Sequence, residues 1–111
     1  MAWIQIDNKI MDYDKYFKLA LTLYITEAHA IGLMVCLWTW AIKYAPDGDI
    51  TDFPALTIAR AAGWIKDPDV FYAAINVPES PFIENVSGRM MLRDWEKIRV
   101  AGYKKDKGRL S

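Results

Sequence analysis

The chain has 111 residues, of which 53% are hydrophobic and 14% aromatic, so it suits one domain with a packed core and excludes a disordered polymer. A single cysteine, Cys36, excludes an internal disulfide and a cysteine-rich zinc site. The first residues lack the basic and long apolar regions of a signal peptide. We therefore expect a cytoplasmic protein.

The formal net charge is zero, but the charges are unevenly distributed. Residues 1–96 carry eight Lys and Arg against thirteen Asp and Glu, whereas residues 97–111 carry six against one. An acidic body repels phosphate, and a basic tail attracts phosphate or an acidic protein surface. We expect a folded domain over 1–96 and a basic tail over 97–111, for which a solvated terminus without a partner is the alternative.

The N-terminal part of the sequence predicts a strand and a helix. Large and polar residues alternate from Trp3 to Ile6, as in a short strand. From Tyr13 onward, apolar residues recur at helical spacing and predict an amphipathic helix. Its expected apolar face consists of Tyr13, Phe17, Ala20, Leu21 and Tyr24.

Residues 28–42 contain no Asp, Glu, Lys or Arg and predict the central helix of the core. Thr26 is a suitable N-cap, and Glu27 suits the first turn of a helix. The stretch is shorter than the roughly 20 residues that cross a bilayer, so we expect no membrane span. Because it is apolar on every side, we expect neighbours on several of its faces.

Two further helices are predicted after a turn at residues 47–49. Ile50 is a candidate rung of a small sheet, and Asp52 and Pro54 mark the start of the third helix, which Gly63 ends. The fourth helix is expected over residues 68–76. Its expected buried residues are Val70, Phe71, Ala74 and Ile75, and its expected outward residues are Asp69, Tyr72, Ala73 and Asn76.

The last predicted element is a β-hairpin, with strands over 82–84 and 89–92 around a turn at 85–88. The fold class is therefore mostly α with a small β-hairpin. Trp64 and Trp95 are expected to close the two ends of the core.

The order helix, short strand, helix, tight turn, helix and hairpin is the layout of a winged helix-turn-helix domain with an extra N-terminal strand and helix. Six segments carry a more specific likeness: WIQI, CLWTWA, APDGDI, IARAAGW, DPDVFYAAI and LRDWE. Over residues 2–96 the chain resembles the N-terminal domain of phage replisome organisers and related DnaD-like replication initiation proteins. The resemblance implies association with origin DNA, self-assembly and recruitment of a helicase or its loader.

The fourth helix departs from a DNA-reading helix because it has no basic residue, and Asn76 is its one good base reader. Sequence-specific reading of the major groove is therefore disfavoured. Double-stranded DNA is expected to be held through non-specific phosphate contacts. The candidate DNA-binding residues are Arg60, Lys66, Asn76, Arg89, Lys104, Lys105 and Lys107.

A protein-interaction or oligomerisation domain without direct DNA binding is the alternative, and a transcriptional regulator is less favoured. For a protein-interaction domain, the candidate interface is the N-terminal strand, with Trp3, Ile4 and Ile6, together with Tyr72 on the fourth helix. A homo-oligomer would fit this hypothesis, whereas a strand that extends the sheet within the chain is the other interpretation. An ordinary surface position is the alternative for Tyr72.

The sequence offers no catalytic constellation. His29 and Cys36 are two helical turns apart, about 10 Å, which is too far for a nucleophile pair. A core or capping position is favoured for both. The aspartates at 47, 49 and 52 lack the spacing of a calcium loop and are interpreted as turn and cap residues. We expect no enzyme activity, no cofactor and no metal.

Overall fold

A computed structural model describes residues 13–78, 80–96 and 98. Within these residues, four helices precede a two-stranded antiparallel sheet, which confirms the expected mostly helical class with a small hairpin. The elements are α1 (Tyr13–Leu23), α2 (Glu27–Tyr44), α3 (Ala55–Ala62), α4 (Pro68–Ile75), β1 (Ile83–Val86) and β2 (Arg89–Leu92). The expected strand at Trp3–Ile6 and the tail lysines Lys104, Lys105 and Lys107 lie outside the described residues.

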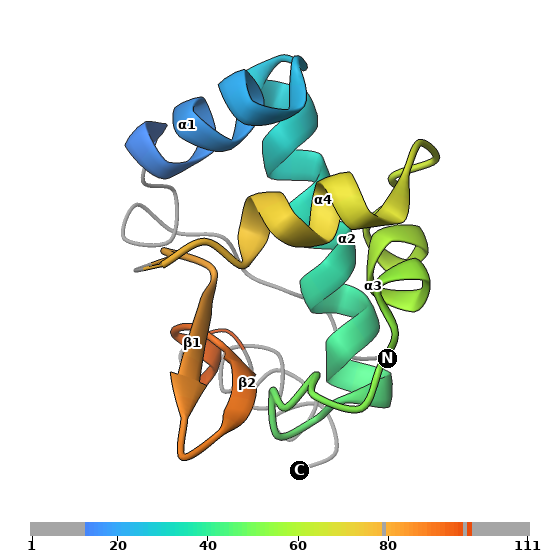
Figure 1. The fold of residues 1–111 in the computed structure, drawn as a ribbon, viewed down its shortest axis with the longest axis vertical. Helices are drawn as coiled ribbons and strands as arrows, with labels where there is room; N and C mark the ends of the chain where they lie inside the picture. The colour runs from blue at the N-terminus through green and yellow to red at the C-terminus, as the bar shows by residue number, and fades with distance from the viewer. Residues whose placement is uncertain (1–12, 79, 97, 99–111) are drawn as a thin grey trace, which may run out of the picture.

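The long helix α2 runs through the centre of the fold, in contact with α1 and α3 (Figure 1). Its N-terminus is capped as predicted, because the Thr26 hydroxyl oxygen accepts a 3.1 Å hydrogen bond from the backbone N–H of His29. Its buried face consists of Ala30, Leu33, Met34, Leu37, Trp38 and Ala41.

Neighbours are present as expected, since α1 and α3 both contact α2. The opposite face of α2 is nevertheless exposed, so the expectation of a helix that is apolar on every side is wrong. His29 and Cys36 are both exposed, so the core alternative is wrong for both. His29 lies in the capped first turn of α2, where its N–H donates to the Thr26 hydroxyl. The opposite face is exposed because it carries small and weakly polar residues, such as Gly32 and Thr39, whose exposure costs little. Their lack of formal charge made the helix look uniformly apolar.

The expected apolar face of α1 is also rotated. The buried side chains are Tyr16, Leu19, Ala20 and Leu23, whereas Phe17, Leu21 and Tyr24 are exposed. Both sets have helical spacing, so the sequence contains two overlapping apolar stripes. Packing selects the first set, in which the ring of Tyr16 lies 5.9 Å from the ring of Phe82.

The turn after α2 pairs with the hairpin through a single bridge, which adds a very short third strand beside β2. Asp49 forms an isolated bridge with Met91, and the N–H of Ile50 donates to the Met90 carbonyl at 2.9 Å. The expected rung is present one residue earlier, at Asp49, and Ile50 supplies one of the hydrogen bonds that flank it. In the hairpin, Val86 pairs with Arg89. The turn therefore has two residues, and it is tighter than the expected turn at 85–88.

The connection between α3 and α4 has the predicted terminal signals. Gly63 ends α3 in the left-handed conformation, at φ +92°. The Asp67 side chain accepts a hydrogen bond from the N–H of Asp69, and Pro68 occupies the first turn of α4.

Helix α4 is held by Phe71 and Ile75, which are buried as expected. Val70 is 47% exposed, so its expected burial is wrong, whereas Tyr72, expected to face outward, is half-buried against the core. Phe71 stacks on Trp64 with ring centroids 6.1 Å apart. This contact sets the rotation of α4 and turns Val70 toward solvent.

Trp64 and Trp95 are both buried in the core, as expected. The indole N–H of Trp64 donates to the Asp67 carbonyl and that of Trp95 to the Pro46 carbonyl, each at 2.9 Å. The core continues beyond Trp95, since Ile98 is buried.

Within residues 13–78, 80–96 and 98, no single helix is long and apolar enough to cross a membrane. Helices α1 and α2 reach that length and composition only as a pair bent by 100°.

Candidate functional site

The outward face of α4 is neutral to acidic. Asp69, Val70 and Ala73 are exposed, and Asn76 is exposed just after the helix. Helix α4 is described over its whole length, and none of its side chains is cationic. The face therefore offers one amide, that of Asn76, for contact with base edges.

Arg60 lies on α3 and clamps the turn that leads to α4. Its guanidinium Nη1 donates to the Trp64 carbonyl and, at 3.3 Å, to the Lys66 carbonyl. Its guanidinium is thus engaged in holding the turn. The charge remains at the surface because Arg60 is exposed.

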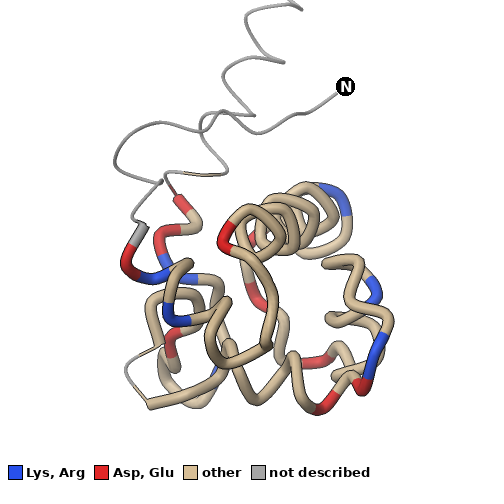
Figure 2. The backbone as a smooth tube through the Cα atoms, turned by 90° about the horizontal axis from the view of Figure 1, so that it is seen from above, with Lys and Arg blue, Asp and Glu red and all other residues tan. Residues whose placement is uncertain are grey.

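Lys66 lies at the same turn, so the structure brings these two candidate DNA-binding residues together. Its ammonium is 6.0 Å from the centroid of the Trp64 ring, and the residue is exposed. Asp67 and Asp69 are exposed at the start of α4 as well, so the cations of Arg60 and Lys66 lie beside two carboxylates. Figure 2 shows that basic and acidic positions alternate along the described backbone.

Arg89 lies far from Arg60 and Lys66 in the sequence and is paired with two carboxylates. Its Nε lies 2.7 Å from Asp49 Oδ2, and its Nη2 lies 3.3 Å from Asp52 Oδ2. Hydrogen bonds from Thr51, and then from Arg89, lower the pKa of Asp49 from 3.8 to about 2. The positive charge expected to contact phosphate is therefore neutralised locally.

Ser80 organises the segment between α4 and the hairpin, although no pattern in the sequence marks it. It is buried; its hydroxyl donates to the Ile75 carbonyl and accepts from the N–H groups of Phe82 and Ile83 at 3.0 and 3.2 Å. Arg93 adds a 2.8 Å hydrogen bond to the Ser80 carbonyl. These bonds fix where β1 begins relative to the end of α4.

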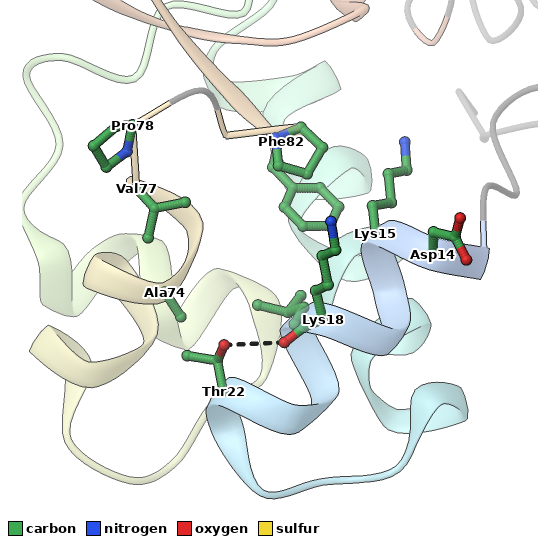
Figure 3. A pocket seen from close by; sticks show the side chains of 10 residues that line it. Asp14, Lys15, Lys18, Thr22, Ala74, Val77, Pro78 and Phe82 are labelled. Atoms are coloured by element: carbon green, nitrogen blue, oxygen red, sulfur yellow. Dashed lines mark hydrogen bonds between the residues drawn. The ribbon is translucent and has the colours of Figure 1, made fainter.

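An open groove of about 460 Å³ lies between α1 and the segment that follows α4 (Figure 3). Lys15, Lys18 and Thr22 line it from α1, and Val77 and Pro78 line it from the other side. The sequence did not single out this groove. Its lining is brought together only because α1 contacts α4.

The described part of the chain contains no group of three or more His, Cys, Asp or Glu residues that could hold a metal ion. Comparison of the chain with protein-family models, with curated proteins and with solved structures finds no match.

Proposed function

We propose that the chain is a winged helix-turn-helix module of the replication-initiation type, which binds DNA mainly through non-specific phosphate contacts and assembles with protein partners. The observation that carries the proposal is the order of the elements, together with the bridge that pairs the turn after α2 with the hairpin. Helix α2, the bridge at Asp49, helices α3 and α4, and the hairpin follow one another in the order of a winged helix. The bridge pairs with β2, which places it beside the hairpin.

The charges favour phosphate contact over base reading. The exposed face of α4 lacks the Arg, Lys and Gln side chains that read bases. Lys66 and Arg60 supply cations at the start of α4, and residues 97–111 carry half of the other Lys and Arg residues within fifteen positions. Lys104, Lys105 and Lys107 are the proposed tail contacts. Such contacts attract any duplex and carry no sequence information.

The test is fluorescence anisotropy of two labelled duplexes of unrelated sequence, each titrated with the full chain at low and at physiological salt. The proposal predicts similar affinities for the two duplexes and a steep loss of affinity with salt, because counterions are released on binding. Absence of binding at both salt concentrations would contradict the DNA contact.

Assembly without DNA binding is the second candidate function. The local hydrogen bonds and ion pairs of Arg60 and Arg89 favour it. Arg60 holds the α3–α4 turn and Arg89 is paired with Asp49 and Asp52, so both have local partners. A homo-oligomer would give a mass in solution that rises with concentration. A strictly monomeric mass at high concentration would exclude self-association through Trp3, Ile4, Ile6 or Tyr72.

A further inference from the structure

We propose that the aromatic cluster of Trp40, Tyr44 and Phe53 binds a proline-rich segment of a partner protein that carries a basic residue. The cluster lies where the C-terminal end of α2 meets the loop that leads into α3 (Figure 1). The proposal rests on the assembly part of the proposed function, since it names the chemistry of a partner. It does not depend on DNA binding, because none of the candidate DNA-binding residues belongs to the cluster.

The three rings form one cluster with Trp40 in the middle, and all of them reach the surface. The Trp40 centroid is 5.7 Å from that of Tyr44 and 4.8 Å from that of Phe53, which it meets at an interplanar angle of 78°. Tyr44 is 55% exposed, and Trp40 and Phe53 are half-buried. These contacts hold the rings in place, so an aromatic surface exists before any ligand arrives.

Two hydrogen-bond donors are available on this surface. Within residues 13–78, 80–96 and 98, neither the Trp40 indole N–H nor the Tyr44 hydroxyl has a hydrogen-bond partner. The Trp40 N–H reaches solvent, because the one buried side-chain polar atom without a partner in this part of the chain is the indole nitrogen of Trp38. A ligand that binds here should therefore supply hydrogen-bond acceptors beside an apolar surface.

A proline-rich segment has this combination of groups. Proline lacks a backbone N–H, and polyproline II has no internal hydrogen bonds, so the carbonyl groups of such a segment are open acceptors. Aromatic-lined surfaces bind polyproline II ligands, whose backbone is ordered before binding. An α-helical ligand fits less well, because most of its backbone carbonyls are already bonded within the helix.

Exposed carboxylates flank the rings. Asp47 follows Tyr44 by three residues, and Asp52 directly precedes Phe53. The Asp47 carboxylate accepts a 3.1 Å hydrogen bond from a backbone N–H and has no ion pair within the described part of the chain. The Asp52 carboxylate lies 3.3 Å from Arg89, and its side chain is 84% exposed. Asp47 is therefore the carboxylate that a basic residue of the ligand would contact.

A single-stranded nucleic acid suits this surface less well. Proteins that bind single strands combine exposed rings with a positively charged groove. Three carboxylates lie at this end of the fold, those of Asp47, Asp49 and Asp52. Two cations oppose them, Lys43 over one of the rings and Arg89 between two of the carboxylates. The excess of negative charge favours a basic peptide over a phosphate backbone.

The experiment begins with selection of random twelve-residue peptides on the immobilised full chain. The selected peptides are labelled and titrated by fluorescence anisotropy against the wild type, Y44A, Y44F and W40F. Y24A is the matched control, because Tyr24 is also an exposed tyrosine near a helix end and lies outside the cluster. Thermal unfolding shows that each variant is folded at the temperature of the titration.

We expect proline to be enriched in the selected peptides, together with arginine or lysine. Y44A should weaken their binding by about tenfold, because it removes one ring of the surface. Y44F and W40F keep a ring and lose one donor, so each should weaken binding by about threefold. Y24A should bind as the wild type does. Selection without proline enrichment, or equal binding by Y44A and wild type, would overturn the proposal.

D47N tests the contact with the basic residue of the ligand. Asparagine keeps an oxygen that can accept from the backbone N–H and removes the charge. At low salt D47N should bind the selected peptides more weakly than the wild type, and the difference should shrink at physiological salt, because ions screen an exposed charge pair. Equal binding by the two proteins at both salt concentrations would overturn the assignment of Asp47.

The outcomes separate this proposal from the proposed function. If the mass in solution rises with concentration and no proline-rich peptide is selected, assembly stands while the site assigned here is wrong. If proline-rich peptides bind as expected and no duplex binds, the site stands while the DNA contact fails. If a labelled oligothymidylate binds the wild type, binds Y44A more weakly, and no peptide is selected, the rings bind nucleic acid and the peptide proposal is wrong.

Discussion

The indole ring of Trp95 lies directly against the backbone of Gly48. A Cβ atom on Gly48 would come within 2.5 Å of Trp95 Cγ and Cδ1, and Gly48 has a φ of +80°. The same indole donates a hydrogen bond to the Pro46 carbonyl. The turn before the Asp49 bridge and the segment after β2 are therefore fitted to each other, and this contact holds the hairpin to the helical body.

The substitution G48A should destabilise the protein by roughly 2–5 kcal/mol, because it combines a strained left-handed backbone with a clash against a buried ring. Urea denaturation measures the loss. G32A is the matched control: Gly32 lies inside α2 with nothing within 4 Å of an added Cβ. It should stabilise the protein by about 0.5–1 kcal/mol. A G48A variant as stable as wild type would contradict the contact.

Asp49 should make stability depend on acid. Its pKa is lowered to about 2 in the fold, so its stabilising effect is complete above the unfolded value of 3.8 and is lost as the pH falls toward 2. The difference in unfolding free energy between wild type and D49N should therefore shrink between pH 4 and pH 2. R89Q should retain part of this dependence, because the hydrogen bonds from Thr51 remain. A difference that stays constant over this range would refute the assignment.

Arg60 has a clamping function that charge alone does not reproduce. R60Q should cost about 1–2 kcal/mol, since hydrogen bonds to the Trp64 and Lys66 carbonyls are removed. R60K should lose much of the same stability, because an ammonium lacks the planar fork of donors. Thermal unfolding compares the variants. In duplex titrations, only R60Q should weaken binding, since R60K keeps the charge. If both variants unfold at the same temperature as the wild type, Arg60 does not stabilise the turn.

The hydroxyl of Ser80 should contribute more to the free energy of unfolding than the hydroxyl of a typical surface serine does. S80A removes one donor and one acceptor and leaves the Ile75 carbonyl and the N–H groups of Phe82 and Ile83 without this partner, for an expected loss of about 2–3 kcal/mol. Chemical denaturation measures it, with T39A as the control because Thr39 is exposed and its hydroxyl donates only to the Val35 carbonyl within α2. Equal losses in the two variants would argue against a special position for Ser80.

The helix ends were predictable because their signals are local. Thr26 caps α2, Gly63 ends α3, and Asp67 begins α4, each through bonds or dihedral angles within a few residues. These signals were sufficient to predict the order of the elements.

The faces of the helices were harder to predict because tertiary contacts choose them. In α1 two apolar stripes compete, and the contact of Tyr16 with Phe82 decides between them. The pairing of Arg89 with Asp49 joins residues 40 positions apart, so no local pattern shows it. Ser80 lies between two prolines, Pro78 and Pro81, a pattern typical of a loop. Its buried hydroxyl joins the end of α4, at Ile75, to the start of the hairpin, at Phe82 and Ile83.

The most direct test of the proposed DNA contact is the salt dependence of duplex binding by the wild-type chain and by the triple variant K104Q/K105Q/K107Q. Fluorescence anisotropy of one labelled duplex, titrated at several salt concentrations, gives the affinity and its slope. The account predicts weaker binding and a slope that is less steep by about 2 to 3, because each phosphate that a lysine no longer neutralises lowers the slope by about 0.9. Identical affinities and slopes for the two proteins would contradict it.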